Sequence, residues 1–170
     1  MKQYAPFFEW FENDRKELGV VEELLTSLNE TSDLGLHSPQ IHKPDPPDCI
    51  CLNASGGCVA IEVAEVVCEE ATRRTAKGER VMRLWNPGEF FNRVGALLAE
   101  KDRKTFHGGP YAAIVACLFT DEPMLTLEQA RVECGANRFG SYQQLTAAYL
   151  LFSYDPRTKS YPVVPLTITT

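Results

Sequence analysis

The sequence predicts an α/β fold (α+β in the stricter sense) in which a single mixed β-sheet is flanked by helices. Three observations support this: helical and strand-like segments alternate, two strand-like segments are joined by a Gly-Gly turn, and residues 111–119 form a continuous apolar run. The chain has 170 residues, of which 44% are hydrophobic and 24% charged, as expected for one soluble globular domain. Because neither a linker nor an internal repeat is visible, we expect a single domain over residues 1–170.

The first half of the chain predicts a helix followed by a β-hairpin. Apolar residues recur at helical spacing among charged ones, as in one amphipathic helix or two short helices that meet at Gly19. A polar, proline-rich stretch follows, in which helix is excluded. Two runs rich in Val, Ile and Cys then flank a glycine-containing turn over 53–57, as in a hairpin. In order, we expect a helix over 7–28, the polar stretch over 29–47, and strands over 49–52 and 58–67.

The second half predicts two further helices and three further strands. Asn86 and Glu89 have the spacing of a helix cap, and Thr126 and Gln129 have the spacing of a capping box. The apolar run over 111–119 is typical of a strand that is buried on both faces. In order, we expect a charged loop over 73–83, a helix from residue 86 to about 104, a strand over 111–119, a short helix over 126–133, and strands over 145–154 and 161–168.

The charge balance restricts the class of function. The chain has 17 basic and 23 acidic residues, with a net charge of −6, which argues against tight, non-specific coating of DNA. Only a local basic cluster of Lys101, Arg103 and Lys104 stands out. No apolar run reaches the length of a membrane span, and acidic residues follow closely on the N-terminus, unlike in a signal peptide. We therefore expect a cytoplasmic protein with no membrane partner.

The segment with the clearest chemical meaning extends from Asp48 to Glu62. Asp48 opens the first strand of the hairpin and Glu62 lies in the middle of the second, so the hairpin can bring the two carboxylates side by side. Burying a charge among Val, Ala and Ile is costly unless the charge is paired or bound to a metal. Two converging carboxylates would repel each other unless a divalent cation such as Mg²⁺ or Mn²⁺ lay between them.

These residues resemble the motif of the PD-(D/E)XK nuclease-like superfamily. The matching features are Pro47-Asp48, thirteen intervening residues, and Glu62 in an apolar strand. A wider pattern (PPD, a hairpin, IEVAE, a helix ending in KDRK, and an apolar strand closing in TDEP) resembles uncharacterised bacterial proteins that look like members of this superfamily. The resemblance covers roughly residues 45–123. It implies a restriction-endonuclease-like core and a metal-dependent nuclease that hydrolyses phosphodiester bonds in DNA or RNA, in a defence or mobile-element setting.

The motif departs from the family pattern at its lysine. The family places a lysine two residues after the glutamate, where this chain has Ala64, but some members supply it from the following helix. Here Lys101 and Lys104 extend the apolar stripe of that helix by helical steps. The resemblance thus implies catalytic roles for Asp48, Glu62, Lys101 and Lys104, with Asp48 and Glu62 as ligands of Mg²⁺ or Mn²⁺. A glutamate of the first helix often completes such sites, and Glu22 or Glu23 is the candidate.

Each of these residues also has a purely structural interpretation. Asp48 can cap a turn, Glu62 can face solvent on an edge strand, and Lys101 and Lys104 can interact with the dipole of their helix. The corresponding alternative function is a catalytically inactive nuclease-like fold. It would serve as an acidic binding protein, such as an immunity protein or antitoxin that covers the basic site of a toxin. A third possibility is an accessory subunit that dimerises through its C-terminal strands.

Overall fold

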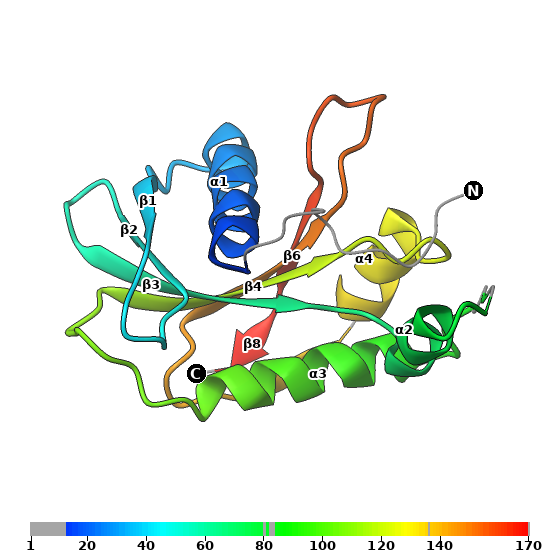
Figure 1. Ribbon diagram of the computed structural model, residues 1–170. Helices are drawn as coiled ribbons and strands as arrows, with labels where there is room; N and C mark the ends of the chain where they lie inside the picture. The colour runs from blue at the N-terminus through cyan, green and yellow to red at the C-terminus, as the bar shows by residue number, and fades with distance from the viewer. Residues whose placement is uncertain (1–12, 80, 82–83, 136, 170) are drawn as a thin grey trace.

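The computed structural model describes residues 13–79, 81, 84–135 and 137–169, and it confirms the α/β fold class (Figure 1). Six strands form one mixed sheet in the order β1-β2-β3-β4-β6-β7, and two short strands, β5 and β8, form a second sheet that the sequence did not predict. The strands are β1 (His37–Ile41), β2 (Cys49–Leu52), β3 (Cys58–Glu65), β4 (Ala113–Thr120), β5 (Phe139–Ser141), β6 (Ala147–Phe152), β7 (Val163–Leu166) and β8 (Ile168–Thr169).

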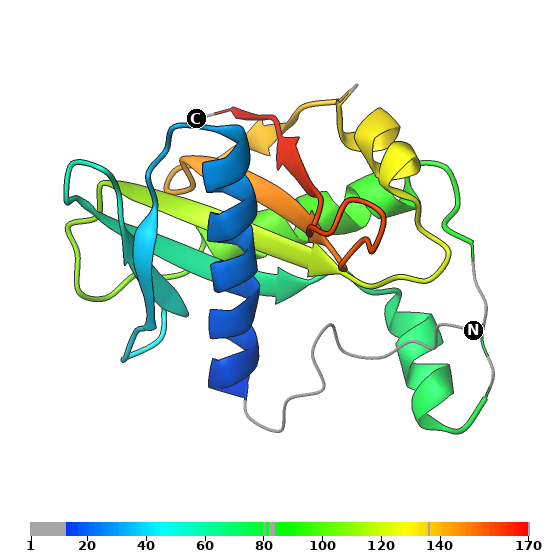
Figure 2. The same cartoon turned by 90° about the horizontal axis from the view of Figure 1, so that it is seen from above.

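The two longest helices cover opposite faces of the large sheet. The helices are α1 (Asn13–Thr31), α2 (Glu69–Ala76), α3 (Glu89–Asp102) and α4 (Leu127–Gly135). Figures 1 and 2 show α1 on one face and α3 on the other. Each helix packs an apolar stripe against the sheet, so there is one hydrophobic cluster per face. Leu24 of α1 belongs to one cluster and Phe90 of α3 to the other, and both side chains are fully buried.

The centre of the sheet fixes the direction in which each residue of β3 points. β3 pairs with β2 in antiparallel and with β4 in parallel orientation. Ile61 and Val63 belong to the cluster beneath α1, whereas Ala64 packs against the cluster beneath α3. Because side chains alternate along a strand, Glu62 points to the α3 face and Glu65 to the α1 face. The sheet therefore directs Glu62 towards α3.

Several boundaries differ from the expectations. The first helix is continuous through Gly19 and extends to Thr31, while residues 7–12 of the expected helix lie outside the described residues. β1 lies within the stretch expected to be polar connection, and it is an edge strand, the place in a sheet where Pro39 is tolerated.

Two expectations about helices are corrected. The charged segment expected to be a loop from residue 73 is helical up to Ala76, because acidic residues in the first turn of α2 and arginines in its last turn complement the helix dipole. α3 begins at Glu89 after Gly88, whose φ of 75° is left-handed, and not at an Asn86 cap. Instead, the Glu89 carboxylate accepts a hydrogen bond from the Asn86 N–H at 3.0 Å.

Among the described residues, none of the helices has the length and apolar character needed to cross a bilayer.

Candidate metal centre

Asp48 and Glu62 meet as the hairpin predicts. β2 and β3 are in register with Cys49 opposite Ile61, so Asp48, which immediately precedes β2, lies opposite Glu62. The Asp48 N–H donates to Glu62 Oε1 at 3.2 Å, and the Val63 N–H donates to Asp48 Oδ2 at 2.7 Å. Glu62 is fully buried and Asp48 is 8% exposed. The backbone of the hairpin therefore holds both carboxylates in place, and the solvent-facing interpretation of Glu62 is wrong.

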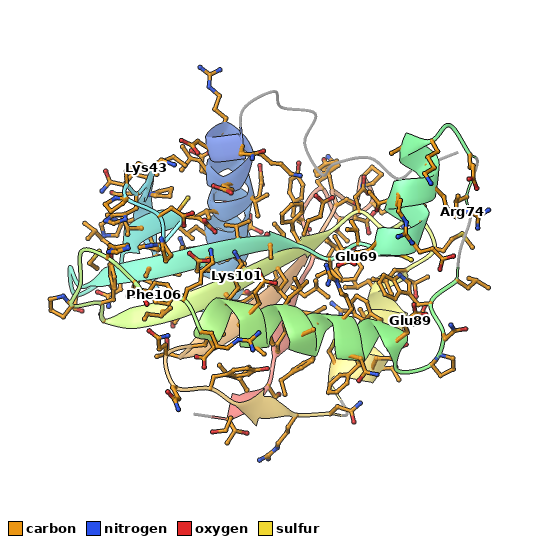
Figure 3. The ribbon with its side chains drawn as sticks, turned by 60° about the horizontal axis from the view of Figure 1, so that its bottom comes forward. Lys43, Glu69, Arg74, Glu89, Lys101 and Phe106 are labelled. Carbon is orange, nitrogen blue, oxygen red and sulfur yellow. The ribbon has the colours of Figure 1, made fainter. Side chains whose placement is uncertain are left out.

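Both predicted lysines reach this pair from α3. Lys101 lies in the last turn of α3, and Lys104 lies two residues beyond the end of the helix. The Lys101 Nζ is 2.9 Å from Glu62 Oε2 and 3.6 Å from Asp48 Oδ2, and the Lys104 Nζ is 2.7 Å from Glu62 Oε2. Figure 3 shows Lys101 at the end of α3 where the chain leaves the helix. The lysines thus contact buried carboxylates, which goes beyond an interaction with the helix dipole.

The end of α3 is anchored by an aspartate next to Lys101. The Asp102 carboxylate accepts the backbone N–H groups of Gln143, Gln144 and Leu145 at 2.8–3.0 Å. Partial burial raises the pKa of Asp102, but these three hydrogen bonds more than offset that effect and lower it below its usual value. Since Asp102 stays ionised and bound to the 143–145 segment, the last turn of α3 presents Lys101 in a fixed direction.

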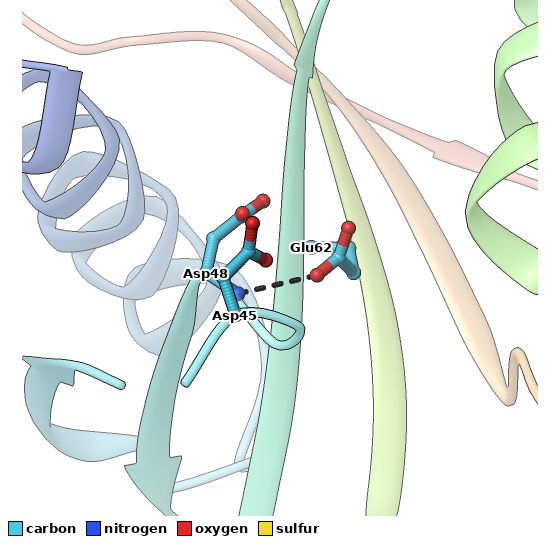
Figure 4. A group of neighbouring side chains, drawn as sticks. All are labelled: Asp45, Asp48 and Glu62. Carbon is cyan, nitrogen blue, oxygen red and sulfur yellow. Dashed lines mark hydrogen bonds between the residues drawn. The ribbon is translucent and has the colours of Figure 1, made fainter. Parts of the chain in front are cut away.

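A third carboxylate, that of Asp45, joins the pair from the preceding loop. Asp45, Asp48 and Glu62 each offer an oxygen atom, and these atoms lie within 4.8 Å of one another (Figure 4). Asp45 is exposed, and its Oδ1 is 3.9 Å from the Lys104 Nζ. The sequence interpretation missed Asp45, although the repeated pattern of Asp45-Pro46-Pro47-Asp48 is a signal that could have identified it. We call Asp45, Asp48 and Glu62 the carboxylate cluster.

The chemistry of the carboxylate cluster fits a hard divalent cation. Carboxylate oxygens are the preferred ligands of Mg²⁺ and Mn²⁺. Burial, followed by the charge of Glu62, holds the pKa of Asp48 above its usual value, although Lys101 and Lys104 act in the opposite direction. The surroundings of Asp48 therefore penalise its negative charge, and a cation at the cluster would relieve that penalty.

On α1, Glu17 interacts electrostatically with members of the carboxylate cluster. Partial burial, followed by the charges of Asp48 and Asp14, raises the pKa of Glu17 to about 7. Glu22 is exposed, and Glu23 lines a separate pocket with Tyr161. Five residues of helix rotate a side chain by about 140°, so Glu17 and Glu22 cannot face the same neighbour. The structure brings Asp48, Glu62, Lys101 and Lys104 together, and among the described residues the group of carboxylates that could hold a metal contains Asp45 and not Glu22.

Comparisons of the chain with protein-family models, with curated proteins and with solved structures find no match. The functional argument therefore depends on the geometry of the carboxylate cluster and its two lysines.

Proposed function

We propose that this protein is a metal-dependent nuclease that hydrolyses phosphodiester bonds in DNA or RNA. One observation supports this above the others: two buried carboxylates from neighbouring strands and two ammonium groups from the end of α3 converge within direct contact distance. This is the arrangement that the resemblance to the PD-(D/E)XK nuclease-like superfamily implies, with the lysine supplied by the helix because Ala64 occupies the usual position.

In this proposal Asp45, Asp48 and Glu62 would hold Mg²⁺ or Mn²⁺. A bound divalent cation supplies a water molecule of lowered pKa and polarises a phosphoryl oxygen. The charges of the site support this assignment, because three carboxylates facing two ammonium groups leave one negative charge. A divalent cation would change this to one positive charge, which matches the single negative charge of a phosphodiester.

The two lysines are suited to different tasks. The Lys101 side chain is 9% exposed and contacts both Glu62 and Asp48, so it orients the two carboxylates. The Lys104 side chain is 28% exposed, so its ammonium group can also reach a ligand at the surface. Burial lowers the pKa of Lys104, but the Glu62 carboxylate outweighs this effect and the pKa lies above its usual value. Lys104 therefore stays protonated, as a group that stabilises negative charge on a phosphate must.

The test is cleavage of labelled DNA and RNA in Mg²⁺ or Mn²⁺, with and without a chelator. We expect activity to depend on the metal and to fall by about 100-fold or more in Asp48→Asn and Asp45→Asn. Glu65→Gln is the matched control, because Glu65 lies on the same strand but on the opposite face. Cleavage that is unchanged in the two aspartate variants would refute the proposal.

A binding measurement separates the metal site from turnover. A titration with Mn²⁺ can be monitored by calorimetry or by thermal unfolding. We expect Mn²⁺ to bind and stabilise the wild type, and to bind more weakly to Asp45→Asn. Asp45 is exposed, so this substitution removes a ligand without leaving a buried charge unpaired.

The alternative, an inactive nuclease-like fold that binds a basic partner, is supported by a different observation. Both ammonium groups already contact Glu62, so the cluster can be neutralised by the chain itself and serve only as a structural ion-pair network. In that case neither cleavage nor Mn²⁺ binding would be detected. The acidic surface, with a net charge of −6, would then be the functional feature.

A further inference from the structure

We infer that the nucleic acid held at this centre is single-stranded, and that its bases stack on side-chain rings of two loops beside the carboxylate cluster. The inference rests on the proposed nuclease function and adds the form of its substrate. The two loops, residues 42–48 and 103–111, are called the rim loops below. The first carries Asp45 and Asp48, and the second follows directly from Lys101 and α3.

Direct contacts join the rim loops to each other. The His107 N–H donates to the Pro46 carbonyl oxygen at 2.9 Å, which joins the two loops, and the His42 N–H donates to the Asp48 carbonyl oxygen at 3.1 Å, which closes the first loop. The His42 ring lies against Gly108, where a Cβ atom would be only 2.8 Å from His42 Nε2. Gly108 has a φ of +82°, which also favours glycine. The loops therefore form one continuous surface that includes two members of the carboxylate cluster.

This surface is rich in planar rings. His42, Phe106, His107 and Tyr111 lie on the rim loops; His107 is exposed and the other three are half-buried. The Tyr111 hydroxyl donates to the His107 carbonyl oxygen, which fixes the two residues relative to each other. Figure 3 shows Phe106 on the loop after α3, at the same end of the helix as Lys101. Side-chain rings of this kind are what unpaired bases stack on, and a base-paired duplex does not expose its base faces.

Three of the cations near the centre contact the protein's own carboxylates, and Arg103, on the second rim loop, is exposed. Lys101 and Lys104 contact Glu62, and Lys43 contacts Asp14 at 3.1 Å. Holding a duplex by its backbone requires many lysines and arginines that face phosphates, whereas this chain has an excess of acidic residues. Stacking adds affinity without adding positive charge. The rings and the charge balance therefore favour a single strand over a duplex.

The experiment measures binding and cleavage separately on the full chain. A short fluorescent DNA strand of mixed sequence, the same strand as RNA, and the DNA strand annealed to its complement are titrated by anisotropy with Ca²⁺ present. We expect single strands to bind more tightly than the duplex. Raising the salt from about 50 to about 200 mM should weaken single-strand binding by less than about 10-fold, in contrast to a protein that makes many phosphate contacts.

Two substitutions test the rings themselves. His107→Ala removes an exposed ring and keeps the N–H that binds Pro46, and Phe106→Leu keeps apolar volume but removes the planar ring. Each should weaken single-strand binding by about 5-fold or more, the loss of one stacked base. Thr105→Ala, an exposed neighbour without a ring, is the matched control and should leave binding unchanged. Thermal unfolding shows whether the variants fold.

The outcomes distinguish this inference from the proposed function. If the duplex is bound and cut as well as the single strand while cleavage still depends on Asp48, the inference is wrong and the nuclease function stands. Single-strand binding that is insensitive to both ring substitutions also overturns it. If single strands bind through the rings but nothing is cleaved, the nuclease function is wrong and the ring surface stands as a nucleic-acid-binding site.

Discussion

Glu62 and Glu65 lie three residues apart on β3 and occupy very different surroundings. Glu65 points to the α1 face and, among the described residues, pairs with one cation, the Lys16 Nζ at 2.8 Å; the Glu65 side chain is 24% exposed and the Lys16 side chain 17%. The Lys16 ammonium also lies 5.0 Å from the centre of the Phe119 ring. Glu62 points to the α3 face, is fully buried, and contacts two lysines and the backbone of a second acidic residue. The same strand thus carries one simple ion pair and one dense cluster.

The Lys16–Glu65 ion pair can be explained by structural stability alone, whereas the cluster around Glu62 is harder to explain in this way. One carboxylate and one ammonium group at the edge of a core neutralise each other, and water screens what remains. Around Glu62 three carboxylates and two ammonium groups gather; Glu62, Asp48 and Lys101 are buried, whereas Asp45 and Lys104 keep contact with water. The buried part of this gathering is costly to assemble. This cost is the reason why we place the proposed function on this face of the sheet.

The largest expected effect comes from removing the buried carboxylate. Glu62→Gln should lower the free energy of unfolding by about 3–5 kcal/mol, because the two ammonium groups then face a neutral amide in a buried site. Glu65→Gln should lower it by less than about 1 kcal/mol, because that pair is partly exposed. Urea unfolding of both variants measures the contrast. Equal losses would show that the two faces of β3 do not differ in the way described.

The next effect separates the two lysines. Lys101→Met should lower the free energy of unfolding by about 2 kcal/mol, since Asp48 and Glu62 lose a buried partner, whereas Lys104→Met should cost about 1 kcal/mol. The effect of Lys104→Met on cleavage should be large compared with its effect on stability: turnover should fall by about 100-fold although the free energy of unfolding changes little. Lys104→Arg keeps the charge and is the control. If cleavage follows stability in all three variants, Lys104 has no role of its own.

The sequence was sufficient to predict the central geometry because that geometry is regular. A hairpin fixes which residues are opposite each other, so Asp48 and Glu62 could be paired from their spacing, and helical steps place Lys101 on the face that carries Val94 and Leu97. The helix ends at Asp102, before the expected residue 104, and Lys104 follows in a turn in which its N–H donates to the Lys101 carbonyl oxygen at 3.3 Å. No comparably regular rule places Asp45, whose position depends on the path of a proline-rich loop.

The remaining errors come from features set by tertiary packing. Which face of α1 meets the cluster depends on how the whole helix docks, so the sequence indicated Glu22 or Glu23 and did not single out Glu17. β1 and α2 bury few side chains of their own, and so the apolar pattern that predicted the other elements was absent. β1 is specified by its pairing with β2. The N-terminal end of α2 is held by Glu122, whose Oε1 accepts the Cys68 N–H at 2.6 Å.

A smaller effect is a pH dependence that originates in Glu17. Its pKa is raised from 4.5 to about 7, mainly by burial and then by the charge of Asp48. The folded state therefore binds this proton more tightly than the unfolded state, and its contribution to stability is present below about pH 4.5 and lost as the pH rises through about 7. Comparing thermal unfolding of the wild type and Glu17→Gln at about pH 5 and about pH 8 tests this. The stability of the wild type relative to the variant should decrease with rising pH, and a constant difference would contradict the assignment.

The smallest expected effect is the coupling between Lys16 and Glu65. A double-mutant cycle with Lys16→Met and Glu65→Gln should give a coupling energy of about 0.5 kcal/mol, because both side chains remain in contact with water and each loses conformational freedom on pairing. Raising the ionic strength to about 1 M should reduce it further, since salt screens partly exposed charges. The corresponding cycle with Lys101→Met and Glu62→Gln should give a larger coupling that changes little with salt. A salt-sensitive coupling at Glu62 would mean that water reaches the Glu62 carboxylate, and the contrast between the two faces of β3 would then be one of degree only.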